Sequence, residues 1–519
     1  MLDIRIRGGL VVAGAESPRK VDVGVEGGRI TAVGKGLGPA RRSVDASGML
    51  VAPGFIDMHT HSDFTLPVRP SADAKLLQGV TTDVTGNCGF SPFPLADDVS
   101  ALHHGDFLEQ ELHERWPTLR AYADEMEGRR LGINVVPLVG LGAIRLSVLG
   151  EANVRADESA VARMSDLLTG AMHDGAFGAS SGLVYAPSSF ADAEELRALA
   201  AVVAAEDGIY ATHVRNEGAQ LGDAVDEAIQ VARSTGCRLQ ISHLKALGRA
   251  NWGTTTHALD RIDRANASGC DVWVDAYPYT AGSSTLSSLL PPESLDGGEM
   301  ELRRRLAMPE ERARLAQFLE RGDALFALDD VLLGTVPGQP QLGGSSLTEV
   351  ADREGITPSE LVLRLLERVG TKISMVAFGM SELDVRSVLT HPRTLLGSDG
   401  WTMSADAVEY AHPRNFASTV RLLARYVRDE RVIELSAAIA KLAYLPARRL
   451  GLVERGLISA GAVADLVIID LDRLSEGSSF EHPCAYPVGI EHVFVAGEQA
   501  VENGRVTGQR AGRVLRKQG

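Results

Sequence analysis

Eight apolar segments alternate with helix-like segments through the middle of the chain, and this alternation constrains the fold more than any other feature. Helix-like segments such as 192–206, 222–234 and 255–267 separate the apolar ones. The apolar segments end in polar or glycine-rich residues and span 54–61, 80–88, 132–139, 176–183, 209–214, 238–244, 271–277 and 394–399. Such alternation is typical of parallel βα units. Eight units predict an α/β fold, a closed (β/α)8 TIM-like barrel whose active site lies at the C-terminal ends of the strands.

Both ends of the chain contain short strand-like segments separated by glycine turns. We interpret residues 1–52 and 446–519 as two parts of one small β-sandwich, with the barrel at 53–445 between them. A chain of 519 residues has room for more than one domain. The gap between the seventh and eighth apolar segments is long, and we expect an insertion at about 286–348. It is interpreted either as a lid over the barrel mouth or as a surface excursion.

The composition argues against several classes of function. A net charge of −16 and a pI near 5.3 are unfavourable for a nucleic-acid partner, which requires a basic surface. The four cysteines lie far apart and show no CxxC spacing, so a disulfide framework is not expected. The first residues alternate polar and apolar side chains, unlike a signal peptide, and no apolar run is long enough to span a bilayer. We therefore expect a cytoplasmic protein with no membrane partner.

Two histidines end the first apolar segment. His59 and His61 are alternate residues, so in an extended strand their imidazoles point to the same side. Two convergent neutral imidazoles can hold a divalent metal such as zinc. A metal that keeps an open coordination position generates hydroxide from water near neutral pH. Taken alone, the pair is equally consistent with two chance histidines near a strand end.

Further residues of metal-binding type stand at the ends of other apolar segments. Cys88 ends the second segment, His213 the fifth, His243 the sixth and Asp399 the eighth. Thiolate, imidazole and carboxylate are ligands that zinc prefers, so the combination indicates a zinc site at the barrel mouth. Each residue alone has another interpretation, such as packing for Cys88 or turn formation for Asp399. Three other histidines fall in an acidic connection and are expected to be solvated: His103, His104 and His113.

Asp399 has two candidate roles. It is either a simple metal ligand or the group that takes a proton from the metal-bound water and passes it to the leaving group. One carboxylate performs both proton transfers if it lies within hydrogen-bond reach of the water.

Other polar residues follow the strand ends and are candidates for binding a substrate carboxylate: Tyr185, Lys245, Tyr277 and Ser283. A lysine ammonium and hydroxyl groups suit a carboxylate. The alternative is a surface lysine with tyrosines that belong to the core. An acidic substrate side chain would require an arginine, and Arg215 and Arg414 are the candidates.

These residues stand in motifs that resemble a known family. The motifs are GFIDMHTHSD at 54–63, GNCGF at 86–90, HVRNEG at 213–218, YPYTAGS at 277–283 and GSDG at 397–400. They resemble the amidohydrolase superfamily and, within it, the N-acyl-D-amino-acid deacylases, or D-aminoacylases. The resemblance extends over nearly the whole chain. The HxH motif and late aspartate are shared by the superfamily, whereas the GNCG cysteine and the YPYTAGS run are more specific.

The resemblance implies zinc-dependent hydrolysis of the amide bond of a small-molecule N-acyl-D-amino acid to a carboxylic acid and a free D-amino acid. It implies one tight zinc site at Cys88, His213 and His243, and a second, weaker position near His59, His61 and Cys88. Asp399 would be the catalytic acid and base, and Tyr185, Lys245, Tyr277 and Ser283 would surround the substrate carboxylate.

The sequence departs from the family pattern at two places near the expected mouth of the barrel. Leu141 stands where the family often has histidine, and residues 417–419 are Ala-Ser-Thr where Gly-Thr-Phe is common. Both departures leave the metal residues intact. They leave the preferred substrate and its stereochemistry open, and the sequence does not predict the oligomeric state.

Two other functions remain open. The first is hydrolysis of cyclic amides, as in hydantoinases and dihydroorotases, although the cysteine after the second segment favours the deacylases. The second is a barrel that serves as a non-catalytic scaffold, which fold alone does not exclude. The complete set of candidate ligands argues against the scaffold.

Overall fold

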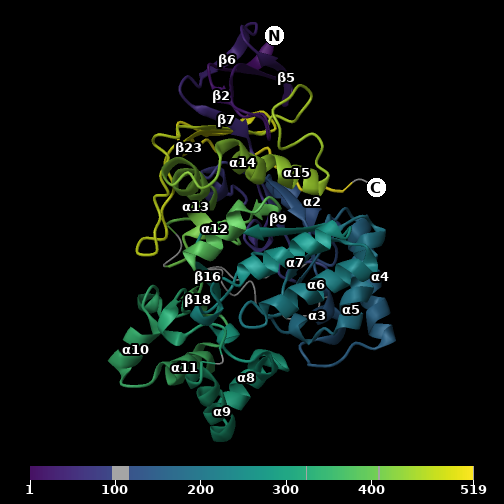
Figure 1. The fold of residues 1–519 in the computed structure, drawn as a ribbon, viewed down its shortest axis with the longest axis vertical. Helices are drawn as coiled ribbons and strands as arrows, with labels where there is room; N and C mark the ends of the chain where they lie inside the picture. The colour runs from purple at the N-terminus through teal and green to yellow at the C-terminus, as the bar shows by residue number, and fades with distance from the viewer. Residues whose placement is uncertain (96–115, 323, 407–409, 518–519) are drawn as a thin grey trace.

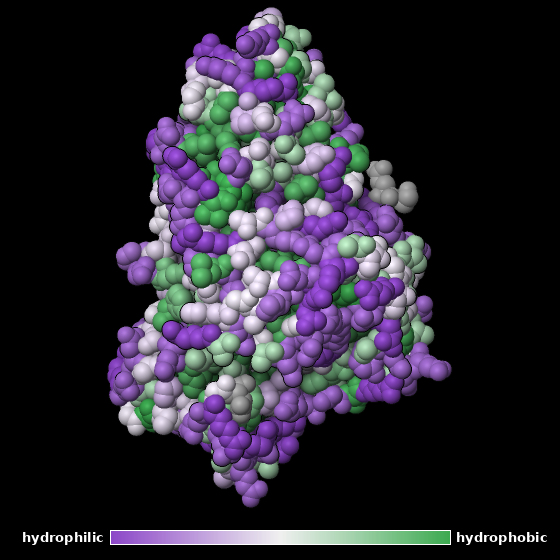
Figure 2. Space-filling view, viewed as in Figure 1, coloured by the Kyte–Doolittle hydropathy of each residue, from purple (hydrophilic) through white to green (hydrophobic). Residues whose placement is uncertain are grey.

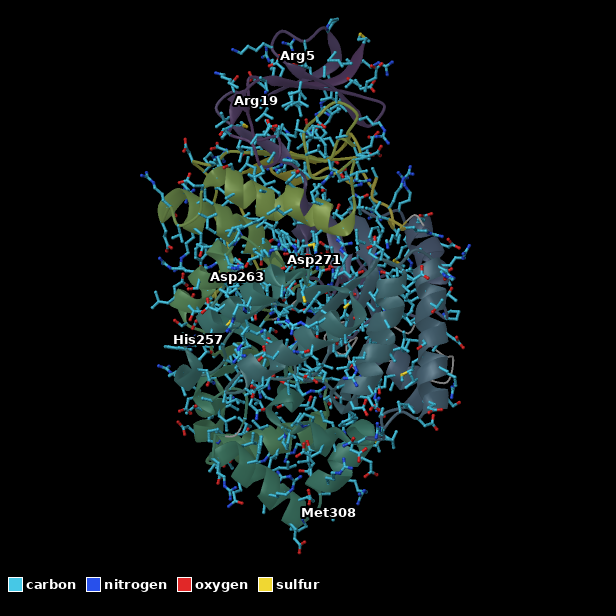
Figure 3. All side chains as sticks on the ribbon, turned by 45° about the vertical axis from the view of Figure 1, so that its right-hand side comes forward. Arg5, Arg19, His257, Asp263, Asp271 and Met308 are labelled. Atoms are coloured by element: carbon cyan, nitrogen blue, oxygen red, sulfur yellow. The ribbon has the colours of Figure 1, made fainter. Side chains whose placement is uncertain are left out.

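The computed structural model describes residues 1–95, 116–322, 324–406 and 410–517. His103, His104 and His113 lie outside these residues. The molecule is elongated, with a β-rich end, a central α/β part and a helical lobe at the opposite end (Figure 1). Arg5 and Arg19 lie near the β-rich end and Met308 lies at the tip of the lobe (Figure 3).

Parallel strands form the central part. They are β8 (Phe55–Asp57), β9 (Val80–Thr85), β10 (Asn134–Pro137), β11 (Val139–Gly140), β12 (Gly178–Gly182), β13 (Ile209–His213), β14 (Arg238–Ile241), β15 (Val272–Ala276) and β19 (Thr394–Leu396). The pairing order is β8–β9–β10 and β11–β12–β13–β14–β15–β19. Backbone hydrogen bonds from Met58 to Leu396 (3.1 Å) and from Asp399 to His59 (2.8 Å) join the last strand to the residues after the first. The C-terminal ends of these strands therefore meet at one face, as the eight apolar segments predicted.

Helices cover the outside of these strands. They include α1 (Asp73–Leu76), α2 (Leu119–Arg129), α3 (Leu141–Leu149), α4 (Glu158–His173), α5 (Ala193–Ala205), α6 (Leu221–Thr235), α7 (Thr255–Ala267), α12 (Glu382–Thr390), α13 (Arg414–Arg421), α14 (Leu435–Ile439) and α15 (Leu445–Leu450). Helix α5 begins where the Asp192 carboxylate accepts hydrogen bonds from two backbone N–H groups, each 2.9 Å long. In α6, Leu221, Val225 and Ile229 recur at helical spacing and are buried. The strands beneath are buried on both faces, as expected for a parallel sheet covered by helices.

Segments from both ends of the chain build the β-rich end. One sheet has the order β5–β4–β1–β6 and the other β23–β22–β21–β20–β7–β2–β3. The bounds are β1 (Leu2–Arg7), β2 (Leu10–Val11), β3 (Arg19–Lys20), β4 (Asp22–Glu26), β5 (Arg29–Gly34), β6 (Ala40–Asp45), β7 (Leu50–Pro53), β20 (Leu466–Ile469), β21 (Ile490–Val495), β22 (Glu498–Glu502) and β23 (Arg505–Val506). Apolar side chains from both ends pack together, for example Ile6 and Val25 with Ile468 and Phe494.

The helical lobe lies between β15 and β19 in the sequence. Its antiparallel sheet consists of β16 (Ala281–Thr285), β17 (Val331–Leu333) and β18 (Ser374–Phe378). Four helices accompany it, α8 (Gly298–Leu306), α9 (Pro309–Glu320), α10 (Leu347–Glu354) and α11 (Pro358–Val369). The lobe therefore extends beyond 286–348 at both ends. Strand β16 follows β15 closely, so the lobe supplies residues to the same face as the ends of the central strands.

The surface is mixed in character. Hydrophilic residues cover most of the face in Figure 2, with smaller hydrophobic groups between them. Within the described ranges, no helix has the length and apolar character needed to cross a membrane.

Candidate active site

A tight turn after β9 holds Cys88 over the strand ends. Cys88 itself has a φ of 52°, which is unfavourable for a residue with a side chain. Gly86 has a φ of 75°, and a Cβ there would lie 2.0 Å from the carbonyl oxygen of Leu138. At Gly182 a Cβ would lie 2.0 Å from the carbonyl oxygen of Cys88. Glycine is therefore required at Gly86, within the turn, and at Gly182, on the strand that packs against it. This close packing fixes the position of the Cys88 sulfur.

Cys88, His213 and His243 form one cluster of potential metal ligands. The Cys88 Sγ lies 3.7 Å from His213 Nδ1 and 3.4 Å from His243 Nε2. Two atoms bound to one tetrahedral zinc lie about 3.5 Å apart, because Zn–S bonds are about 2.3 Å and Zn–N bonds about 2.0 Å. All three side chains are buried. The donor set and its spacing therefore fit a single metal ion.

A second cluster shares the same sulfur and adds His59, His61 and Asp399. His59 Nε2 lies 3.3 Å from Cys88 Sγ and 3.5 Å from Asp399 Oδ1. His61 Nε2 lies 3.1 Å from the same Asp399 oxygen. The structure thus brings together all six residues that the sequence nominated as metal ligands, with the cysteine between the two clusters.

Two carboxylates that the sequence analysis did not assign support these histidines. Glu217 Oε2 lies 3.2 Å from His213 Nε2 and its Oε1 lies 3.1 Å from His243 Nδ1. Asp275 Oδ1 lies 3.0 Å from His59 Nδ1 and accepts a 2.8 Å hydrogen bond from the His243 backbone. Carboxylates in such positions fix the orientation of ligating imidazoles. Sequence features could have identified both carboxylates, because Glu217 stands in the HVRNEG motif and Asp275 near the end of a strand.

The electrostatics of the cluster favour an ionised sulfur. Burial by itself raises the pKa of the Cys88 thiol, but the adjacent His59 and His243 hold this pKa well below its usual value. Burial by itself lowers the pKa of His213, but the Glu217 carboxylate and the Cys88 sulfur raise it, and the net pKa is about 9. A thiolate is the form of cysteine that binds metal.

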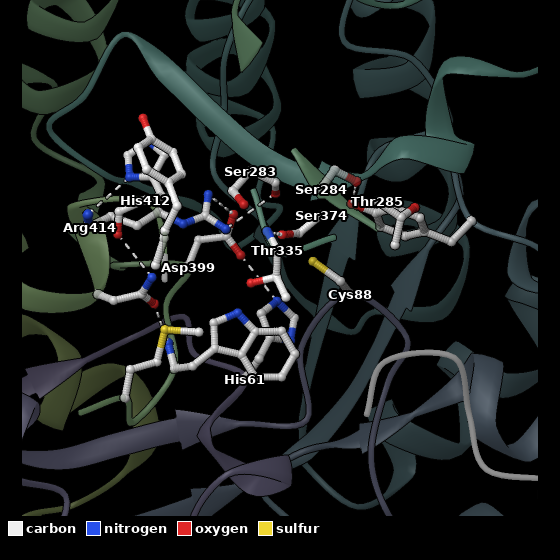
Figure 4. A pocket seen from close by; sticks show the side chains of 16 residues that line it. His61, Cys88, Ser283, Ser284, Thr285, Thr335, Ser374, Asp399, His412 and Arg414 are labelled. Carbon is white, nitrogen blue, oxygen red and sulfur yellow. Dashed lines mark hydrogen bonds and ion pairs between the residues drawn. The ribbon is translucent and has the colours of Figure 1, made fainter. Parts of the chain in front are cut away.

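A pocket opens beside the clusters (Figure 4). It is lined by His61, Cys88, Tyr185, Ser283, Ser284, Thr285, Thr335, Ser374, Asp399, Trp401, Met403, Tyr410, Ala411, His412, Arg414 and Asn415. Arg414 forms an ion pair with Asp399 Oδ2 at 2.8 Å, and its guanidinium carbon lies 5.1 Å from the centre of the Tyr277 ring. Burial raises the pKa of Asp399, but Arg414 and the nearby histidines hold the net pKa well below the usual value.

The four residues expected around a substrate carboxylate divide into two groups. Tyr185 and Ser283 line the pocket, and Tyr277 is buried behind Arg414. Lys245 instead lies behind His243, where its Nζ contacts Glu217 Oε1 at 2.6 Å and His243 Nδ1 at 2.7 Å. Of the two arginine candidates, Arg414 is at the pocket.

The other arginine candidate, Arg215, has a different environment. Its guanidinium pairs with Glu227 at 3.1 Å and donates to the carbonyl oxygens of Ser189 and Ala191. These contacts hold the loop after β12 rather than a ligand.

Asp63 gives the metal-free protein a specific pH dependence. It is buried, and burial raises the pKa of its carboxyl from 3.8 to about 7. Between these two pH values the unfolded chain has released this proton and the folded chain has not, so stability falls as pH rises. The total effect is up to about 4 kcal/mol at 1.36 kcal/mol per pKa unit. We expect the melting temperature of metal-free Asp63→Asn, measured by calorimetry, to fall less than that of the metal-free parent as the pH rises from about 5 to 8. Parallel profiles for the two proteins would contradict the assignment.

Comparisons with known proteins agree with the motifs. A model described as amidohydrolase family matches residues 42–292 and 310–501. The N-acyl-D-glutamate deacylase of Alcaligenes xylosoxydans xylosoxydans is 37% identical over 522 residues, which cover 99% of this chain and 97% of that protein.

Solved structures give the same result. N-acyl-D-glutamate deacylase from Bordetella bronchiseptica, complexed with zinc and a phosphonate mimic of the tetrahedral intermediate, is 33% identical, with a TM-score of 0.85 over 99% of both chains. A D-aminoacylase with a binuclear metal centre is 32% identical, with a TM-score of 0.86 over 100% of both chains. A D-hydantoinase, 16% identical with a TM-score of 0.57 over 99% of this chain and 98% of its own, shares the fold alone. The chain therefore belongs to the amidohydrolase family, as an enzyme of the group that contains the D-aminoacylases.

Proposed function

We propose that this enzyme hydrolyses the amide bond of N-acyl-D-amino acids in a zinc-dependent reaction. The observation that carries the proposal is one pocket that joins the Cys88 cluster, Asp399 and Arg414. Of the proteins compared above, those at least 30% identical are N-acyl-D-glutamate deacylases and a D-aminoacylase. The proposed architecture is a closed (β/α)8 barrel at 53–445 carrying the inserted lobe, with a β-sandwich formed by 1–52 and 446–519.

The proposed tight zinc site consists of Cys88, His213 and His243. A second and weaker position would use His59, His61, Cys88 and Asp399, the other cluster that shares the sulfur. When bound, zinc lowers the pKa of a coordinated water and polarises the substrate carbonyl. The side chains of this chain supply the remaining functions.

Asp399 is proposed to move the proton. It would accept a proton from the attacking water and then donate it to the departing amine. Its pKa is low because Arg414 pairs with it. If the substrate carboxylate takes over part of the Arg414 charge, the pKa of Asp399 rises and the carboxylate becomes a stronger base. Substrate binding would therefore prepare the base.

Arg414 and Ser283 are proposed to bind the substrate carboxylate, with Tyr277 holding the Arg414 guanidinium from behind. The Arg414 Nη2 lies 3.4 Å from the Ser283 carbonyl oxygen, and the guanidinium lies over the Tyr277 ring. A planar guanidinium matches a carboxylate with two parallel hydrogen bonds. The ring and the ion pair hold it in position before substrate arrives.

Tyr185 is proposed to stabilise the developing oxyanion. Its ring packs edge-on against His213, with centres 5.2 Å apart, and its hydroxyl lies 3.3 Å from Ser284 Oγ. Burial raises the pKa of Tyr185 well above its usual value, so the hydroxyl keeps its proton at neutral pH. A protonated hydroxyl at the pocket wall is suited to donate to an oxygen that gains negative charge.

Lys245 and Glu217 are proposed to position the ligating histidines. The Lys245 ammonium and the Glu217 carboxylate form a buried pair at 2.6 Å behind His243. We expect Glu217→Gln to weaken zinc binding by about 10- to 100-fold, because the amide orients His213 and His243 less strongly. Competition with a chelator measures this affinity. Glu195→Gln, which alters a buried carboxylate paired with Arg145 elsewhere, is the matched control. Equal affinity in Glu217→Gln and the parent would contradict the role.

Paired N-acetyl-D- and N-acetyl-L-amino acids test the function directly, with hydantoins as a third arm. We expect release of free D-amino acid, dependent on added zinc after chelation, and little release from the L series. Faster hydrolysis of hydantoins would favour the cyclic-amide alternative. Full zinc occupancy without hydrolysis of any of these compounds would contradict deacylation.

A further inference from the structure

A second pocket, largely apolar, adjoins the pocket at the metal clusters, and we call it the adjoining pocket. The two share Tyr185 and Thr285 as a common wall. The apolar lining of the adjoining pocket comes from helix α3, from loops of the central part and from the lobe. It consists chiefly of Phe90, Leu146, Val184, Leu290, Pro292 and Leu295. We propose that this pocket receives the acyl chain of the substrate and that the enzyme prefers apolar acyl groups longer than acetyl. The inference rests on the proposed function.

The order of groups along the first pocket supports this assignment. Arg414 and His412 enter the pocket from one side, and Ser284 and Thr285 lie toward the other (Figure 4). The Arg414 guanidinium and the Asp399 carboxylate lie beside each other between them, 2.8 Å apart. In an N-acyl amino acid the amide carbonyl likewise lies between the carboxylate and the acyl chain. With the carboxylate at Arg414 and the carbonyl beside Asp399, the acyl chain extends toward Thr285. Beyond Thr285 and Tyr185 lies the adjoining pocket.

The polar groups that line the adjoining pocket are already engaged. Thr285 Oγ1 lies 3.0 Å from Ser287 Oγ, and Ser288 donates a 2.7 Å hydrogen bond to the Thr285 carbonyl oxygen. The Glu299 carboxylate accepts from the Thr371 backbone at 3.0 Å and pairs with Arg303 at 2.8 Å. These groups do not require a polar ligand.

The charge of the lining also selects against a carboxylate. No lysine, arginine or histidine is among the described residues that line the adjoining pocket, and Glu151 and Glu299 are. A ligand carboxylate placed there would lack a cationic partner, which is costly away from water. An apolar chain has no such cost and gains by covering Phe90, Leu146 and Leu290. The occupant that fits is therefore hydrocarbon, and the carboxylate belongs at Arg414.

A chain-length series tests the inference. One D-amino acid that the parent releases from its acetyl derivative is compared as acetyl, butyryl, hexanoyl and octanoyl derivatives. We expect kcat/KM to rise by up to about fourfold per buried methylene, and by more than about tenfold from acetyl to hexanoyl. Leu295→Trp, at a half-buried position of the lining, should reduce this gain to about threefold or less and leave acetyl turnover within about twofold of the parent. Leu146→Trp is a second variant of the same design, and Leu383→Trp, at a leucine 76% exposed on α12, is the matched control.

The outcomes separate the inference from the proposed function. Acetyl turnover with no gain for longer chains, or a gain unchanged in both tryptophan variants, would overturn the acyl assignment alone. If kcat/KM instead rises with the length of the amino-acid side chain, and Leu295→Trp loses this rise, the pocket holds the side chain. That result would also overturn the acyl assignment. Hydrolysis of none of the acyl-D-amino acids would overturn the proposed function and the acyl assignment together.

Discussion

Replacement of Asp399 by asparagine is expected to lower kcat by about 10²- to 10⁴-fold, the usual contribution of general acid–base catalysis. Asparagine keeps the size of the side chain and removes the ionisable carboxyl that would accept and return the proton. The proposed tight zinc ligands, Cys88, His213 and His243, are unchanged, so occupancy of the tight site, measured by atomic spectroscopy after dialysis to remove weakly bound metal, should remain at the parental value. Turnover of an N-acyl-D-amino acid is then measured on the metal-loaded variant.

The control distinguishes proton transfer from the loss of any buried carboxylate. Asp384 is also buried and accepts a 2.9 Å hydrogen bond from the Gly253 backbone, away from the pocket. Asp384→Asn should therefore retain most of the parental kcat if it folds. Parental turnover by metal-loaded Asp399→Asn would remove the proposed proton carrier. A low kcat that accompanies lost metal would instead make Asp399 mainly a ligand.

Replacement of Cys88 by alanine is expected to abolish turnover through loss of metal. The sulfur is the one donor common to both clusters, at 3.3–3.7 Å from three imidazole nitrogens. Loss of a residue that only supports a metal ligand typically weakens metal binding by about 10- to 100-fold. Loss of the sulfur, which is itself a proposed ligand, should weaken metal binding more than this. Metal content after dialysis and kcat at saturating zinc are the two measurements.

Cys237→Ala is the matched control, since Cys237 is another buried free cysteine that packs in the core at the opposite ends of the strands. It should retain metal and turnover, with a modest loss of stability. Full zinc content in Cys88→Ala would show that the histidines suffice to bind zinc. The proposed role of the sulfur as a ligand would then be wrong.

Much of the central fold follows from local sequence. Runs such as 209–214 and 238–244 are apolar because parallel strands are buried on both faces. Each has a histidine as its next-to-last residue, near the strand end where a barrel carries its active site. The six candidate metal ligands were predictable for this reason. The family resemblance added specificity where spacing alone left alternatives, and it was confirmed by relatives that match almost the full chain.

The remaining features depend on contacts between distant residues. The lobe is longer than expected, because its sheet begins at β16 and ends at β18. Ser283 in β16 pairs with Val376 in β18, and local periodicity does not reveal so distant a partner. Lys245 shows a related limit. Its position after the sixth apolar segment suggested a substrate contact, but in the structure its ammonium group contacts Glu217 and His243 instead. Asp275 supports His59 from 216 positions away.

The division of the pocket between two parts of the chain has an evolutionary consequence. The candidate metal ligands lie at the ends of central strands, whereas Ser284, Thr335 and Ser374 are contributed by the lobe. Mutations within the insertion can therefore diversify which compounds are accepted while the reaction machinery is inherited intact. Exchange of this single segment among relatives would be a direct route by which new specificities arise from an old catalyst.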